Sequence, residues 1–185
     1  GMVTTDDDNL AAELRILRNQ GQTARYHHTH LGFNYRMTEL SAAVGIVQLD
    51  SLSSRLTDKR RVVAQYNHGF QHSEFIQLPV LPDYVDQHAW YMYTLALCPS
   101  VNRDAVVQAL AEKGIETRVS FPPVHIQSYY KKRFGYEVDH FPMSLSAWES
   151  LINLPISPNL ASEDIAFIIE VTLGAVQECS VKETV

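Results

Sequence analysis

A long helical pattern from Thr38 to Phe70 is the feature that most constrains the fold of this chain. Apolar side chains recur along it at helical spacing and change phase once, first at Met37, Leu40, Val44 and Val47, then at Leu49, Leu52 and Leu56. Serines at positions 51, 53 and 54 mark a point where the helix could bend or break. In a chain of 185 residues, a helix this long is expected to span between two lobes or to pack on a partner.

After Phe70 the pattern alternates between short extended runs and helices. The extended runs are residues 75–78, 88–98, 115–121 and 151–154; the helices are 103–113, 126–134, 142–150 and a last one capped by Ser162. This alternation predicts an α/β fold with a short antiparallel or mixed sheet. We expect residues 1–70 and 71–185 to form separate parts, the first containing the long helix.

Composition excludes several classes of protein. Apolar residues make up 45% and charged residues 19%, as in ordinary globular chains, and the net charge of −6 argues against nucleic-acid binding. No apolar run approaches the roughly 20 residues of a membrane span, and no signal peptide is recognisable. Cys98 and Cys179 are far apart, which fits a reducing cytoplasm. Residues 1–5 resemble the end of a buried strand, so the chain is expected to begin within a fold.

No self-sufficient catalytic motif is present, but the segment before the long helix is a candidate binding site. Gly32 to Glu39 leads into a helix start, which favours anions, and Asn34 adds an amide donor. Arg36 adds a charge with forked donors, although it could equally pair with Glu39. From these residues alone, a simple helix cap is favoured over a ligand site.

Two further groups have open interpretations. His27, His28 and His30 lie close together, but no carboxylate or cysteine accompanies them, so a polar loop is favoured over a metal site. Prolines 122 and 123 present His125 on a rigid loop, with Tyr129 and Tyr130 behind it. These side chains could line a site for a sugar ring; alternatively, the tyrosines pack in the core and His125 lies on the surface.

Taken in order, several segments resemble the DegT/StrS-type aminotransferases, enzymes that use pyridoxal phosphate (PLP) to aminate keto sugars bound to nucleotides. The strongest match is Leu31–Leu52, with the sequence LGFNYRMTELSAAVGIVQLDSL. Weaker matches in the same order are Gly1–Asp6, Leu14–Gly21, Arg60–Tyr66, Gly114–Arg118, Pro122–His125, Phe141–Pro142 and Leu154–Ile156.

The resemblance implies the C-terminal portion of an aspartate-aminotransferase-type (fold type I) enzyme that works as a homodimer. It places Asn34, with Arg36, in a loop that binds the PLP phosphate of the neighbouring subunit. It places His125 and Tyr130 near the sugar nucleotide, and it implies an amino acid donor such as glutamate.

The resemblance also implies that this chain contains no catalytic residue. In the family, the lysine that forms the Schiff base with PLP lies upstream of the segment that Gly1 matches. None of the five lysines matches it: Lys59, Lys113, Lys131, Lys132 and Lys182. The chain alone is therefore expected to be inactive and to bind no PLP, and its apolar helix is expected to cause self-association.

Two alternatives remain open. A related group of PLP-dependent sugar dehydratases has histidine in place of the lysine, and the position that decides between them is missing here. The chain could also be a non-catalytic dimerisation module.

Overall fold

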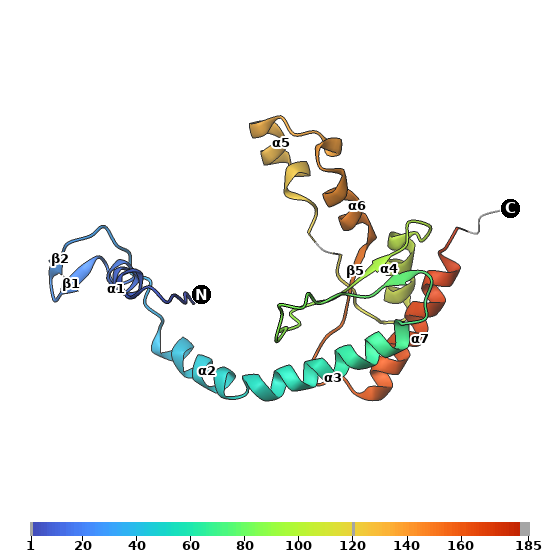
Figure 1. Ribbon diagram of the computed structural model, residues 1–185, viewed down its shortest axis with the longest axis horizontal. Helices are drawn as coiled ribbons and strands as arrows, with labels where there is room; N and C mark the ends of the chain where they lie inside the picture. The colour runs from blue at the N-terminus through green and yellow to red at the C-terminus, as the bar shows by residue number, and fades with distance from the viewer. Residues whose placement is uncertain (1, 120, 182–185) are drawn as a thin grey trace. The chain divides into compact units, whose positions relative to one another are not determined.

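The computed structural model describes residues 2–119 and 121–181 (Figure 1). The chain divides into two compact units, Gly1–Leu52 and Ser53–Val185, called here the N-terminal and C-terminal units. The sequence predicted a different boundary, near residue 70, between two domains of a longer protein. That domain boundary stays a prediction. Residues 2–5 have no regular structure, and Gly1, part of the expected strand end, lies outside the described residues.

The N-terminal unit begins with helix α1 (Asp8–Leu17), followed by strands β1 (Gln22–Ala24) and β2 (His27–His28). Asp7 caps α1, because its carboxylate accepts bonds from the amides of Asn9 and Leu10. The strands pair antiparallel around Tyr26, whose φ is 61°. The sequence predicted only a polar loop in this region.

The long helical pattern is confirmed, with an interruption at Ser51. Helix α2 (Glu39–Asp50) ends at Ser51, and α3 (Leu52–Phe70) begins directly after it. Thr38 caps α2, since its hydroxyl accepts the Ser41 amide at 3.2 Å. Most of the apolar residues of α2 are exposed, namely Leu40, Val44, Ile46, Val47 and Leu49.

The C-terminal unit contains an antiparallel sheet of three short strands in the order β3 (Ile76–Gln77), β4 (Tyr93–Leu97) and β5 (Leu151–Leu154). Ile76 pairs with Leu97, and Tyr93 pairs with Leu154. Alternate residues of β4 are buried, so one face of the sheet is covered. This confirms the predicted α/β class with a short antiparallel sheet.

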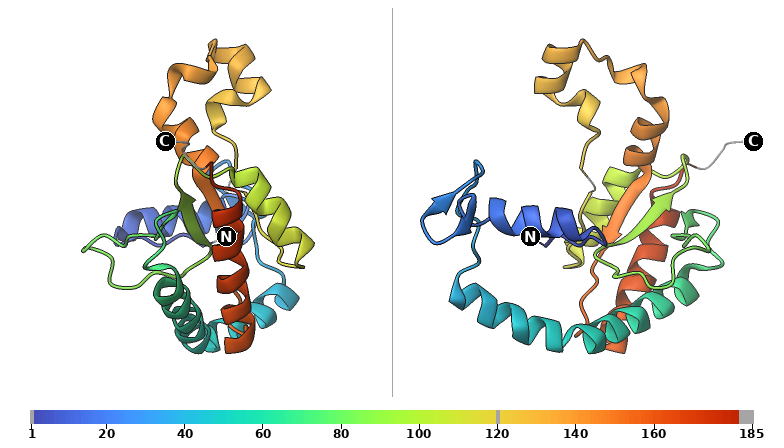
Figure 2. Two further views of the ribbon diagram at one scale, coloured as in Figure 1. Left: turned by 90° about the vertical axis from the view of Figure 1, so that its right-hand side faces the viewer. Right: turned by 60° about the vertical axis from the view of Figure 1, so that its left-hand side comes forward.

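Helices α3, α4 (Arg103–Glu112) and α7 (Ser162–Glu178) supply the rest of the core (Figure 2). Its fully buried side chains include Val62, Tyr66, Phe70, Tyr93, Leu95, Val106, Leu110, Ile152, Ile165 and Val176. Asn102 caps α4 as predicted, accepting the amide of Ala105. The predicted cap of α7 was wrong: Ala161 occupies the cap position, and Ser162 is the first helical residue.

Two predicted strands are shorter than the sequence suggested. In the run 88–98 only Tyr93–Leu97 forms a strand, because Trp90 has a left-handed φ of 48° and its amide bonds to His88. Among the described residues of the run 115–121, only Arg118 pairs, with Asn153 of β5. In that register Pro155 stands opposite Glu116 and has no amide to donate, so the ladder stops. Ser120 lies outside the described residues.

A helical excursion precedes β5. It consists of η1 (Val124–Ile126), α5 (Ser128–Phe134), η2 (Val138–His140) and α6 (Pro142–Ser150), and it extends away from the sheet in both figures. Gly135 ends α5 in a left-handed conformation, with φ 69°. The sequence predicted both α-helices of this excursion.

In residues 2–119 and 121–181, no helix has both the length and the apolar character that crossing a membrane requires.

Candidate functional site

Two glycines in the N-terminal unit lie in direct backbone contact. Gly21 has φ 71°, and a Cβ atom added there would lie 1.7 Å from the carbonyl oxygen of His30. A Cβ atom on Gly32 would lie 2.2 Å from the amide nitrogen of Gly21. Only glycine at both positions permits this approach, which holds the segment after Gly32 against the end of α1.

Backbone hydrogen bonds then fix the segment that carries Asn34. The Phe33 amide donates to the Leu17 carbonyl at 2.9 Å, and the Tyr35 amide donates to the Arg18 carbonyl at 2.9 Å. Asn34 lies between these bonds, paired with Asn19. Its side chain is exposed, and its Oδ1 accepts a long bond of 3.5 Å from the Arg36 amide. The side-chain NH2 group is the part of Asn34 that can donate to a phosphate.

Arg36 is oriented by Asn19. Its Nε donates to Asn19 Oδ1 at 2.6 Å, which uses one of the five guanidinium donors and leaves the forked pair available to a ligand. The segment does contain the predicted helix cap, and the residue that caps α2 is Thr38. In the described structure Arg36 bonds Asn19, not the Glu39 that the sequence offered as a partner.

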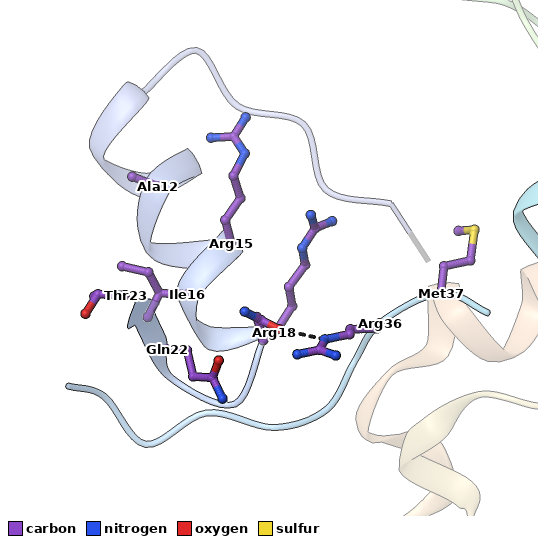
Figure 3. Close-up of a pocket in the computed structure, with 9 residues that line it drawn as sticks. Ala12, Arg15, Ile16, Arg18, Gln22, Thr23, Arg36 and Met37 are labelled. Carbon is purple, nitrogen blue, oxygen red and sulfur yellow. Dashed lines mark hydrogen bonds between the residues drawn. The ribbon is translucent and has the colours of Figure 1, made fainter. Parts of the chain in front are cut away.

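Arg36 also lines a cavity of about 780 Å³ within the N-terminal unit (Figure 3). Arg15 of α1 and Arg18, which follows the helix as its C-cap, line it from one side, and Arg36 lines it from the segment that leads to α2. The other lining residues are Ala12, Ile16, Asn19, Gln22, Thr23 and Met37. The described residues that line this cavity include three arginines and no acidic side chain.

Three guanidinium groups around one cavity suit a ligand with a phosphate group, because arginine donates paired bonds to planar or tetrahedral oxyanions. The sequence prediction included Arg36 but missed Arg15, Arg18 and Asn19. The three-residue spacing of Arg15 and Arg18 puts them on one helix face, which was the available signal. Asn34 itself does not line this cavity.

The arginines and the tyrosine of the Arg60–Tyr66 motif have structural partners in the C-terminal unit. Arg61 Nη2 donates to the Leu160 carbonyl at 2.8 Å, and Arg60 Nη2 donates to Gln87 Oε1 at 3.1 Å. The Tyr66 hydroxyl donates to the Pro155 carbonyl at 2.9 Å. These three bonds attach loop residues of the C-terminal unit to α3.

His125 and Tyr130 lie in the helical excursion and have different surroundings. His125 is only 7% exposed; its Nε2 lies 3.1 Å from the Val138 carbonyl, and its ring centroid is 4.9 Å from that of Phe141. Tyr130 is 38% exposed and stacks near Phe134. This reverses the alternative in which the tyrosines pack in the core and His125 lies on the surface. Their roles toward a substrate stay predictions.

The three histidines of the N-terminal unit occupy the hairpin and the residues after it. His28 Nδ1 lies 2.8 Å from the Gln20 carbonyl, and His27 Nδ1 lies 3.2 Å from the Thr23 hydroxyl. Over the described residues, no group of three histidine, cysteine or acidic side chains is placed to hold a metal ion.

The chain is similar to the members of one protein family. The model of the DegT/DnrJ/EryC1/StrS aminotransferase family matches residues 1–172. GDP-perosamine synthase of Caulobacter vibrioides is 35% identical over 174 residues, which cover 91% of this chain and 46% of that protein.

Solved structures agree with this match. DesV of S. venezuelae superposes with a TM-score of 0.84 at 30% identity, over 92% of this chain and 45% of that one. The sugar aminotransferase Spr1654 of Streptococcus pneumoniae, described as putative and solved in a PLP form, gives 0.82 at 25% identity, over 98% and 47%. The chain spans about half the length of the curated relatives it matches.

Proposed function

Because the chain belongs to the DegT/DnrJ/EryC1/StrS aminotransferase family, we propose that it is the C-terminal portion of a PLP-dependent enzyme that aminates nucleotide-linked keto sugars. The observation that carries the proposal is the family match over residues 1–172, which includes the glycine-clamped segment with Asn34 and Arg36. GDP-perosamine synthase, one of the relatives, supports a nucleotide sugar as the substrate class.

The donor set around Asn34 and Arg36 fits the phosphate of PLP. That group is a dianion near neutral pH, and it would meet an amide NH2 group and a guanidinium whose Nε is already oriented by Asn19. When bound, PLP supplies an electron sink for the bond-breaking step. The contribution of this chain is to bind and orient the phosphate of a neighbouring subunit's cofactor, which makes a homodimer part of the proposal.

We further propose that the lysine that attaches the cofactor is not among these residues, so that the chain alone is inactive. The Lys59 side chain has a partner within the fold, because its Nζ donates to the Trp90 carbonyl at 2.9 Å. Lys131 and Lys132 lie on the short helix α5, and Lys113 follows α4. Lys182 lies outside the described residues.

His125 and Tyr130 are proposed to contact the sugar nucleotide. Tyr130 is the better placed, since part of its ring is exposed and sugar rings pack well on aromatic faces. His125 would act through the ring atoms that its bond to Val138 leaves available.

Two cysteines without a disulfide support a cytoplasmic location.

The test is a transamination assay on the complete polypeptide that contains these residues, with PLP, glutamate and a nucleotide-linked keto sugar. We expect glutamate to be converted to 2-oxoglutarate only when the sugar is present. Loss of a sugar hydroxyl without consumption of glutamate would instead identify the dehydratase, and no reaction in either assay would reject both enzymes.

A dimerisation module is the second candidate, and one observation favours it. Helix α2 exposes apolar side chains around its circumference, and a helix with this pattern is normally buried against other protein. A complete polypeptide that forms a stable dimer but has no activity would support this alternative.

A further inference from the structure

We propose that Arg103 is a positioning residue for the sugar nucleotide, because it fixes the direction in which the helical excursion leaves the sheet. The excursion carries His125 and Tyr130, the two residues proposed to contact that substrate. The inference rests on the proposed function in this one respect. Arg103 acts through the excursion and is assigned no contact with substrate or cofactor.

Arg103 is a cation that the fold of the C-terminal unit buries. It is the first residue of α4, and its side chain is only 10% exposed. A buried guanidinium loses its hydration, so it needs acceptors within the protein. Its Nη1 donates to the carbonyls of Trp148, at 3.2 Å, and Leu151, at 3.3 Å. Its Nε donates to the carboxylate of Asp104 at 2.5 Å, which supplies the counter-charge.

The two carbonyls identify the part of the fold that Arg103 holds. Helix α6 runs directly into β5, since Ser150 is the last residue of the helix and Leu151 the first of the strand. The carboxyl end of a helix is the negative end of its dipole, which favours a cation there. The guanidinium also lies over the Trp148 ring, with Cζ 5.4 Å from the ring centroid. Arg103 therefore holds the junction at which the excursion returns to the sheet.

Packed rings connect α6 with the residues that are proposed to meet the substrate. Phe141 occupies the cap position of α6, and its ring centroid lies 4.9 Å from that of His125. Tyr136 lies 5.5 Å from Phe141, Phe134 lies 5.6 Å from Tyr136, and Tyr130 lies 6.1 Å from Phe134. Because each ring packs against the next, a change in the direction of α6 displaces His125 and Tyr130 with it.

Loss of Arg103 should weaken binding of the sugar nucleotide without slowing the chemical step. The cofactor lysine is proposed to lie outside these residues, and the phosphate-binding segment belongs to the N-terminal unit. The excursion would thus contribute contacts that are equally strong in the bound substrate and in the transition state. Removing contacts of this kind raises KM and leaves kcat unchanged.

The first measurement is amide hydrogen exchange in the chain itself. Arg103→Met removes the charge and the donors but keeps an unbranched side chain. We expect exchange in residues 124–141 to become about 10-fold faster, the effect of losing hydrogen bonds from a charged group, while α3 and α7 keep their rates. Lys113→Met, at an exposed position at the other end of α4, is the matched control and should change neither region.

The second measurement is the steady-state kinetics of the complete polypeptide. Arg103→Met should raise KM for the nucleotide-linked keto sugar about 10-fold, whereas kcat and KM for glutamate should change less than about twofold. Arg103→Lys keeps a cation that can donate to the carbonyls at the end of α6, but it lacks the planar fork. It should therefore recover part of the loss in both measurements.

Unchanged exchange in residues 124–141 would show that Arg103 does not hold the excursion. Equally faster exchange in α3 and α7, or a kcat that falls while KM stays the same, would overturn the positioning role. If Arg103→Met does not fold, Arg103→Lys decides the question, with intermediate effects expected on exchange and on KM. A complete polypeptide without transaminase activity would reject the proposed function, whereas the exchange rates would still show whether Arg103 holds the excursion.

Discussion

Gly32 and Gly21 approach each other so closely that a Cβ atom on Gly32 would lie 2.2 Å from the Gly21 amide nitrogen. This contact aligns the backbone of Phe33 and Tyr35 with the last turn of α1 and thereby places Asn34 and Arg36. The conformation of the proposed phosphate-binding segment thus depends on two glycines, because any side chain at either position would meet backbone atoms.

Gly32→Ala should therefore displace this segment. The added methyl group meets backbone atoms, which cannot rotate away, and overpacking of this kind costs about 3 kcal/mol. We expect faster proteolysis between residues 21 and 36 and a lower free energy of unfolding in urea. Gly45→Ala, in α2, is the control: nothing lies within 4 Å of its Cβ position, and the change should stabilise the helix by about 1 kcal/mol. Equal behaviour of the two variants would contradict this account.

The arginine-lined cavity predicts that the chain itself binds small inorganic phosphate anions. With inorganic pyrophosphate as the probe in calorimetry, Arg18→Gln should reduce affinity about 10-fold, and added salt should reduce it further. Arg133→Gln, on α5 in the other unit, should have no effect. If Arg18→Gln and Arg133→Gln weaken binding to the same extent, the binding is nonspecific.

Exposed apolar residues on α2 predict self-association of the chain. Val44 is 56% exposed, and Leu40 and Val47 lie on the same helix face. We expect light scattering to report a dimer or larger species, and Val44→Glu to shift it toward the monomer. Val80→Glu changes a valine that is 82% exposed outside this helix and should not shift it. If the unmodified chain is a monomer, the prediction of self-association through α2 is wrong.

Two buried tyrosines predict a loss of stability in alkali. Burial raises the pKa of the Tyr66 phenol, and burial followed by the nearby Tyr66 raises that of Tyr93. The folded chain holds these protons more tightly than the unfolded chain, so their contribution is complete below a pH of about 10 and is lost as the pH rises toward the raised values. The free energy of unfolding should fall by up to about 1.4 kcal/mol per pH unit for each tyrosine.

Tyr66→Phe isolates one of these two contributions. At neutral pH it should cost about 1 kcal/mol, because the Pro155 carbonyl loses its donor. Above a pH of about 10 its free energy of unfolding should decline less steeply than that of the unmodified chain. Tyr84→Phe, at an exposed position, should leave the urea unfolding curves unchanged at every pH. Parallel curves for the unmodified chain and Tyr66→Phe would refute the assignment.

Local signals in the sequence predicted much of the fold. Asn102 before α4, Pro142 at the start of α6 and Gly135 after α5 act through their own backbone preferences, so their positions are readable without a partner. Strand lengths were less predictable, because they depend on pairing. Residues 115–119 alternate like a strand, yet only Arg118 finds a donor and an acceptor, on Asn153.

The candidate site was predictable only in part, for the same reason. Asn34 and Arg36 stand out because they follow Gly32 in one continuous motif. Arg15 and Arg18 join them only through the fold, since the hairpin of β1 and β2 returns the chain to the end of α1. That hairpin turns at Tyr26, whose φ is 61°. Tyrosine rarely adopts this left-handed conformation, so the sequence gives no sign of the turn.

The central claim is that these residues belong to a PLP enzyme of which they hold the phosphate-binding segment but not the cofactor lysine. Incubating the chain with PLP, reducing it with borohydride and analysing its peptides by mass spectrometry tests this most directly. The account predicts no specific pyridoxyl group on any of the five lysines. Stoichiometric modification of a single lysine, lost when Asn34→Ala is introduced, would contradict it, because the chain would then contain both parts of the site.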